Sequence, residues 1–248
     1  MSNRIAAKLL AEFIGTFALI FVGAGAAAVV GGGAGLAGVA AIAFAHGLTV
    51  MAFAFAYGPV SGGHFNPSVT TAVLAAGAMR AGEAAGYIVS QLVGGLLGAF
   101  LLRAVLGGAE TGLGTPMLAH NLALGATTLT VTPWAGYVIE ALLGFFLSTV
   151  VLSTAVAGRA GNLAPLAIGV TLVLNIIMGG PLTGAAFNPA RAFGPMVATG
   201  NFSDAWLYLT APIVGAIVAA IVHTGLARLA QERMATADPS AAARTPAE

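Results

Sequence analysis

The chain of 248 residues contains no cysteine, and only 7% of its residues are charged. Without cysteine there can be no disulfide, no thiolate metal site and no thiol nucleophile. Ordinary globular proteins carry about 25% charged residues, so this chain has too few charges to cover a water-exposed surface. Its net charge of +1 provides no basic patch, and nucleic acid is therefore excluded as an expected partner.

What the chain has in abundance is apolar sequence. Hydrophobic residues make up 58%, and the mean hydropathy is +0.96. A helix that spans a bilayer needs about 20 mostly apolar residues. The segments that meet this length are 9–30, 38–58, 84–106, 134–157, 163–181 and 205–228. The first could instead be a signal peptide, but Glu12 lies inside it and a similar segment recurs later. The sequence therefore predicts an all-α, multi-pass membrane protein.

An even number of spans places both termini on one side of the membrane. The basic residues on that side are Arg4, Lys8, Arg80, Arg159, Arg228, Arg233 and Arg244, whereas only Arg103 lies toward the other side. By the positive-inside rule, both termini are predicted to be cytoplasmic. The excess of Arg over Lys favours a bacterial source and hence the plasma (inner) membrane. We expect one membrane domain over 1–230 and a disordered cytoplasmic tail over 231–248, which is rich in Ala, Pro, Ser and Thr.

The chain is built as a duplication. Ser-Gly-Gly-His-Phe-Asn-Pro-Ser at 61–68 is matched by Thr-Gly-Ala-Ala-Phe-Asn-Pro-Ala at 183–190, and each follows the second span of its half. The first span of each half carries an acid, Glu12 or Glu140. Repeat one covers about 5–110 and repeat two about 130–230. Because each repeat has three spans, the two repeats have opposite orientations and are expected to share a site at the membrane midplane.

Each Asn-Pro pair predicts the start of a helix, since Asn caps the end and Pro has no amide hydrogen to leave unpaired. The apolar stretches that follow, 67–76 and 189–198, rise about 15 Å, which is half of a hydrocarbon core about 30 Å thick. Two such re-entrant half-helices would meet at the centre. Their positive dipole ends would repel cations and protons, while the Asn amides donate to a neutral molecule.

A resemblance to a known family rests on the two motifs, the arginine after the second motif and the two acids. These residues are Asn66, Pro67, Ser68, Asn188, Pro189, Ala190, Arg191, Glu12 and Glu140. Over about residues 5–230 the chain resembles the aquaporin, or major intrinsic protein, family. The resemblance implies six transmembrane helices and two half-helices in inverted three-helix repeats, assembled as a homotetramer in the lipid bilayer. It also implies a passive channel for water and small neutral solutes, with no enzymatic activity and no cofactor. Ser68 departs from the usual Ala, which bears on fine selectivity.

By the same resemblance, the selectivity filter is formed by His46, Ile176, Ala185 and Arg191, and His120 is a further candidate. Glycerol facilitators carry an Asp just after the filter arginine, where this chain has Ala. The filter set is similar to that of plant tonoplast intrinsic proteins, some of which pass ammonia as well as water. We therefore expect water and ammonia as solutes, with a glycerol or urea facilitator as the alternative.

Several of these residues also have plainer interpretations. His46 could be a packed core residue and His120 a solvated loop residue, while His64 could support the loop or act as a gate. Glu12 and Glu140 could relay protons in an ion-coupled transporter, but no further intramembrane acid or lysine completes a relay. We expect them to accept hydrogen bonds from the non-helical loops. A purely structural membrane protein remains a third hypothesis, which predicts negligible water flux.

Overall fold

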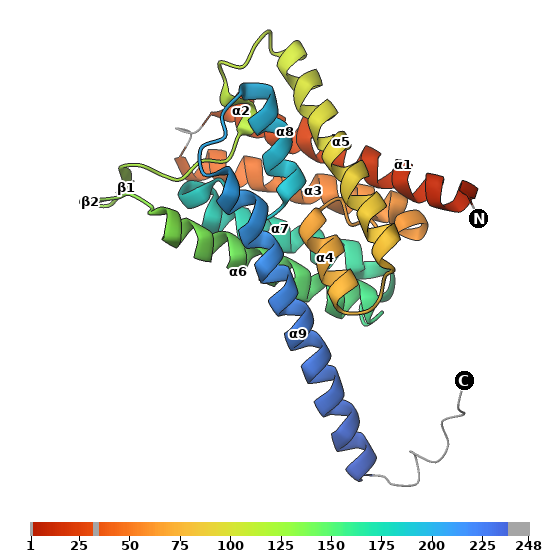
Figure 1. Ribbon diagram of the computed structural model, residues 1–248. Coiled ribbons are helices and arrows are strands. Elements are labelled where there is room, and N and C mark those ends of the chain that lie inside the picture. Colours follow the sequence, from red (N-terminus) through yellow and green to blue (C-terminus); the bar gives the residue numbers. More distant parts are fainter. Residues whose placement is uncertain (1, 32–34, 238–248) are drawn as a thin grey trace.

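The computed structural model describes residues 2–31 and 35–237, which are almost entirely helical (Figure 1). The elements in chain order are α1 (Ser2–Ala18), η1 (Leu19–Ala24), α2 (Gly25–Val30), α3 (Gly35–Ser61), α4 (Pro67–Ala75), α5 (Ala81–Val105), η2 (Gly112–Gly114), β1 (Leu122–Leu124), β2 (Thr127–Leu129), α6 (Pro133–Val151), η3 (Leu152–Val156), η4 (Gly161–Leu163), α7 (Ala164–Thr183), α8 (Pro189–Thr199) and α9 (Ala205–Ala237). Within the described residues, six helical segments are long and apolar enough to cross a membrane. The six predicted spans are therefore confirmed.

The ends of the spans differ from the predicted ones by a few residues in most cases, and by more at the start of α1, which begins at Ser2 rather than at residue 9, and at the end of α9. Helix α3 begins three residues before the predicted 38–58 and ends three residues after it. Helix α9 has 33 residues and runs to Ala237, so it extends well beyond the rest of the bundle (Figure 1). The predicted disordered tail is thus helical over 231–237, because Gln, Glu, Arg, Met and Ala in that stretch are good helix formers that prolong an existing helix without a new nucleus. Residues 238–248 lie outside the described part.

The two repeats pack in equivalent ways and then exchange their half-helices. Helix α1 packs on α5 in the first repeat as α6 packs on α9 in the second, and α3 packs on α7 across the repeats. The half-helix α4 packs on α9, and α8 packs on α5. Each half-helix is therefore held in part by the last span of the other repeat, which locks the two repeats together.

Glycine allows the helices of the two repeats to approach backbone to backbone. A Cβ on Gly47 of α3 would lie 2.5 Å from the carbonyl oxygen of Gly169 in α7. A Cβ on Gly95 of α5 would lie 2.7 Å from the carbonyl oxygen of Ala190 in α8, and one on Gly194 would meet the Gly95 carbonyl. Close approach of small residues is how helices associate in membranes, where lipid removes the hydrophobic driving force.

The two ends of the bundle carry different polar features. At one end the antiparallel hairpin of β1 and β2 leads into α6, and Tyr137 stacks between Trp134 and Trp206, as aromatic residues do at membrane interfaces. At the other end, where α1 and α5 begin, Lys8 Nζ lies 2.6 Å from Glu83 Oε1. The bundle between these ends contains the buried polar residues of the site.

Candidate functional site

The two half-helices begin at their Asn-Pro pairs in the same way. Asn66 Oδ1 accepts a hydrogen bond from the Ser68 amide at 2.8 Å, and Asn188 Oδ1 accepts from the amides of Ala190 and Arg191 at 3.0 and 3.2 Å. Proline occupies the first turn of both helices. The side-chain carbonyl thus caps each N-terminus, as the sequence indicates.

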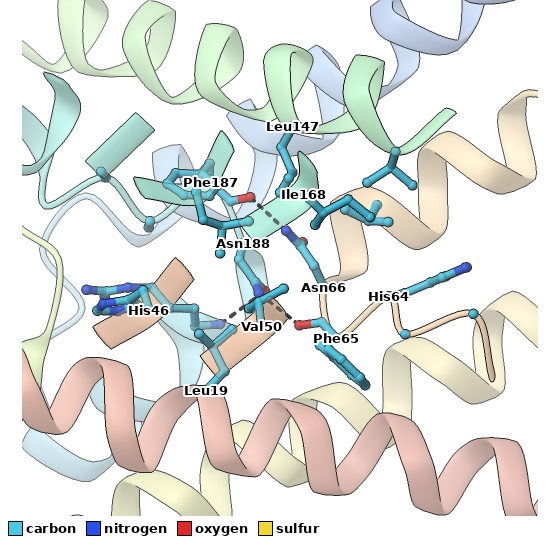
Figure 2. Close-up of a pocket in the computed structure, with 18 residues that line it drawn as sticks. Leu19, His46, Val50, His64, Phe65, Asn66, Leu147, Ile168, Phe187 and Asn188 are labelled. Atoms are coloured by element: carbon cyan, nitrogen blue, oxygen red, sulfur yellow. Dashed lines mark hydrogen bonds between the residues drawn. The ribbon is translucent and has the colours of Figure 1, made fainter. Parts of the chain in front are cut away.

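The other end of each Asn side chain reaches across to the opposite repeat. Asn66 Nδ2 donates to the carbonyl of Phe187 at 3.0 Å, and Asn188 Nδ2 donates to the carbonyl of Phe65 at 2.9 Å (Figure 2). These reciprocal bonds hold the two helix starts head to head, so their positive dipole ends meet. A side-chain amide has two N–H groups, and the second of each Asn is therefore available to a molecule beside it.

The loops before the two Asn residues are strained and buried. Phe65, Ala185 and Phe187 have φ of +49°, +42° and +30°, a region that non-glycine residues seldom occupy. Glu12 holds the first loop. Its Oε1 accepts from Ser61 Oγ at 2.7 Å and from the His64 amide at 3.0 Å, and its Oε2 accepts from the Phe65 amide at 2.7 Å.

Glu140 holds the second loop in the same arrangement. Its Oε1 accepts from Thr183 Oγ1 at 2.6 Å and from the Ala186 amide at 2.9 Å, and its Oε2 accepts from the Phe187 amide. Both carboxylates are fully buried. Glu12 and Glu140 therefore accept hydrogen bonds from the loop amides, as expected from the sequence. Both carboxylates lie behind the loops, and neither lines the cavity beside the Asn pair.

A narrow cavity lies beside the two Asn residues, which form part of its wall. The volume of the cavity is about 30 Å³, which is enough for a water-sized molecule. His46 and His64 lie on opposite sides of the Asn pair (Figure 2). The apolar walls are formed by Leu19, Val50, Val69, Leu147, Val151, Ile168 and Leu172. The cavity is therefore suited to small molecules that pass one at a time.

Two buried nitrogen atoms on the His46 side of the cavity have no hydrogen-bond partner among the described residues: His46 Nε2 and Arg191 Nε. His46 Nδ1 donates to the Ile42 carbonyl at 2.9 Å, so Nε2 of the neutral ring is an acceptor. Arg191 Nη1 donates to the Gly114 carbonyl at 2.8 Å, and its Nε–H is a donor. Unpaired buried polar atoms are costly, and a small polar molecule in the cavity would satisfy both.

The structure brings together most, though not all, of the predicted filter. His46, Ala185 and Arg191 line the cavity. Ile176 is buried but is not among the lining residues, and His120 is exposed on the loop between the repeats. Neither Ile176 nor His120 is therefore among the residues that line the cavity.

Ser68, the departure from the usual motif, bonds locally as its position suggests. Its Oγ lies 2.8 Å from Asn66 Oδ1 and 3.2 Å from the carbonyl of Phe187. The hydroxyl therefore adds a contact between the two repeats that Ala190, its counterpart in the second half-helix, cannot make.

Sequence reasoning missed several supporting residues. Tyr87 and Tyr208 donate to the carbonyls of Ser61 and Thr183 at 2.7 and 2.8 Å, which anchors the start of each loop. The sequence could have indicated both pairs. Ser61 and Thr183 are separated by the same number of residues as Asn66 and Asn188, and the separation of the two tyrosines is one residue shorter. Gly114, whose carbonyl accepts the hydrogen bond from Arg191, lies outside both motifs and could not be recognised from the sequence.

Within the described residues, no group of three or more His, Asp or Glu side chains is arranged to hold a metal ion.

Comparison with known proteins gives a consistent result. A family model described as major intrinsic protein matches residues 1–223. Aquaporin NIP1-2 of Oryza sativa subsp. japonica is 37% identical over 216 residues, which cover 86% of this chain and 69% of the relative. Aquaporin TIP4-4 of Zea mays is 38% identical over 225 residues, covering 88% and 85%. The aquaglyceroporin structure from Plasmodium falciparum has a TM-score of 0.73 at 22% identity, covers 89% of this chain and 96% of that chain, and supports the fold.

Proposed function

Since the chain belongs to the major intrinsic protein family, whose members are passive membrane channels and not enzymes, we propose that it conducts water and ammonia and excludes ions and protons. The observation that carries this proposal is the narrow cavity beside the amides of Asn66 and Asn188. Each amide keeps one N–H for a passing molecule, because its other N–H is bonded to the opposite loop.

The exclusion of ions follows from the charges around the cavity. Both half-helices direct the positive ends of their dipoles at its centre, and Arg191 adds a buried positive charge on the His46 side. No carboxylate of the described residues lines the cavity to offset this field. A cation such as H₃O⁺ or NH₄⁺ would have to give up its hydration shell and enter a region of positive potential. A neutral molecule meets no such barrier.

The unpaired nitrogen atoms of His46 and Arg191 favour ammonia as a second solute. A solute between His46 Nε2 and Arg191 Nε must donate to the first and accept from the second. Water can do both, and so can neutral NH₃. Ala185 contributes only a methyl group to the wall. We infer the filter to be His46, Ala185 and Arg191, with Ile176 behind them, and we expect only weak flux of the larger glycerol molecule.

We further propose a homotetramer in the bacterial plasma membrane with both termini cytoplasmic. The orientation is supported by the basic residues near the ends of α1 and α9 and at the start of α5, including Arg4, Arg80, Arg228 and Arg233. The tetramer is inferred from family membership, with one pore per protomer.

Purified protein in lipid vesicles provides the test. Vesicles are exposed to a hyperosmotic step to follow water efflux, and to an inward ammonium gradient to follow the rise of internal pH. Empty vesicles are one control, and Ala185→Trp, which places a large side chain at the cavity wall, is the other. We expect faster shrinkage and a faster pH rise than in both controls. Water permeability equal to that of empty vesicles would contradict the channel; an ammonia rate no higher than theirs would leave a water channel alone.

A further inference from the structure

A polar network lies behind the first loop, and the residues that the structure describes form no such network behind the second. Gln91 Nε2 in α5 lies 2.8 Å from Glu12 Oε2 and 2.9 Å from Thr70 Oγ1 in α4. Thr70 Oγ1 in turn lies 3.1 Å from His64 Nδ1, and His64 lines the cavity. The chain of contacts thus runs from a buried carboxylate to a cavity-lining ring.

The orientation of Gln91 is fixed by Glu12. Its Nε2 has two N–H groups, and both have acceptors, one on Glu12 and one on Thr70. Turning the amide over would place Gln91 Oε1 against the carboxylate oxygen, where two acceptors would face each other. The unpaired Gln91 Oε1 is the result of this constraint, so Thr70 Oγ1 is an acceptor toward Gln91.

The direction of the hydrogen bond between Thr70 and His64 depends on where the Thr70 hydroxyl proton points. The Thr70 hydroxyl proton is free to donate, and among the described residues the structure gives its Oγ1 no partner other than Gln91 and His64. Thr70 Oγ1 has a second lone pair, so it could accept from a protonated His64 Nδ1, but the hydroxyl proton would then have no acceptor in this network. Donation from Thr70 to an unprotonated Nδ1 of a neutral ring satisfies both the hydroxyl and the ring nitrogen, and this arrangement is therefore favoured. The His64 proton is then on Nε2, the nitrogen turned away from Thr70.

The second repeat folds without this network. At the equivalent positions it carries Ala186 in place of His64, Ala192 in place of Thr70 and Pro212 in place of Gln91. Glu140 nevertheless holds its loop through Thr183, Ala186 and Phe187. The extra polar residues of the first repeat are therefore not required to build the loop, which points to a role in the cavity.

The two cavity histidines consequently differ. We propose that Thr70, held by Gln91, is a positioning residue that keeps the proton of His64 on Nε2, so that His64 offers a donor to the cavity while His46 offers an acceptor. This inference concerns the pore of the proposed function. A water molecule beside His64 then turns its oxygen toward the ring, as it does toward the Asn pair, whereas one beside His46 turns a hydrogen.

Solid-state ¹⁵N NMR of protein labelled at histidine, in lipid vesicles, reads the protonation of each ring nitrogen directly. The chain has four histidines, and the variant His64→Asn identifies the His64 signals by their loss. In the wild type we expect His64 protonated on Nε2 and unprotonated on Nδ1. Thr70→Val removes the donor and should give a mixture of both neutral forms, whereas Thr70→Ser should keep the wild-type form. Thr71→Val is the matched control, because Thr71 Oγ1 bonds only to the carbonyl of Pro67.

A wild-type His64 with its proton on Nδ1, or on both nitrogens, would overturn the proposal. So would a Thr70→Val spectrum identical to that of the wild type. If Thr70→Val does not assemble, the wild-type spectrum decides the matter alone. Osmotic water flux in the same vesicles is measured separately: its absence would contradict the channel function and leave the tautomer assignment standing.

Discussion

At the scale of single residues, Arg191 is the buried cation of the cavity wall, and its guanidinium is held by one bond to the Gly114 carbonyl. Arg191→Val removes this charge, so we expect a higher proton leak than in the wild type, because only the two helix dipoles then oppose a cation. The measurement is the decay of a pH gradient across vesicles. The control is Arg103→Val, whose guanidinium bonds to the Ala198 carbonyl outside the cavity. Equal leaks in both variants would show that Arg191 is not the barrier.

Gly23 packs against His46, a residue of the proposed filter. A Cβ at position 23 would lie 2.6 Å from His46 Cδ2 and 2.9 Å from its Nε2, while the ring is tethered through Nδ1 to Ile42. The ring must therefore shift, and we expect Gly23→Ala to lower water permeability several-fold in vesicles. Gly25→Ala serves as control, since its Cβ would meet only a methyl end of Leu102 at 3.2 Å. Unchanged permeability of Gly23→Ala would refute this role.

At the scale of elements, the two re-entrant loops depend on their carboxylates. Glu140→Gln replaces an acceptor by a donor where one hydroxyl and two amides already donate. Bonds to charged groups contribute about 1.5–3 kcal/mol each, and unpaired buried groups cost about 1–3 kcal/mol, so we expect a loss of about 3 kcal/mol and a lower unfolding temperature in detergent.

The matched control for Glu140→Gln is Glu83→Gln. Glu83 is a partly exposed acid paired with Lys8, and such pairs contribute about 0–1 kcal/mol. We expect its thermal unfolding to stay close to that of the wild type. Equal unfolding temperatures for the two variants would mean that the loops do not rely on Glu140.

The repeat made much of these elements predictable. The spans follow from apolar length, the half-helices from Asn66-Pro67 and Asn188-Pro189, and the glutamates from their place in each half. The remainder depends on three-dimensional contacts. The π-helical turn η1, which brings Gly23 against His46, has no sequence signature, and neither has the loop that carries Gly114 to Arg191. Ile176 was assigned to the filter through the family resemblance, and in the structure it is buried but is not among the residues that line the cavity.

At the scale of the whole molecule, the exchange of half-helices bears on the mode of transport. A carrier with inverted repeats works by rocking one repeat against the other. Here α4 packs on α9 and α8 on α5, with Gly95 against Gly194, so such rocking would break the half-helix contacts. We therefore expect ammonia flux that rises linearly with concentration and is the same with and without a Na⁺ gradient. Saturation at low concentration, or acceleration by the gradient, would favour the ion-coupled transporter.

The head-to-head half-helices have one more consequence, which concerns membrane voltage. Each carries roughly half an elementary charge at either end, but α4 and α8 point in opposite directions, so their dipoles largely cancel along the pore. A membrane field therefore raises the energy of one dipole about as much as it lowers that of the other. Since a charge crossing the membrane gains about 2.3 kcal/mol per 100 mV, and a neutral solute gains none, the membrane potential does not drive a neutral solute and has little net effect on the paired backbone dipoles. The proposed channel would thus pass neutral solutes in an energised membrane without dissipating the membrane potential.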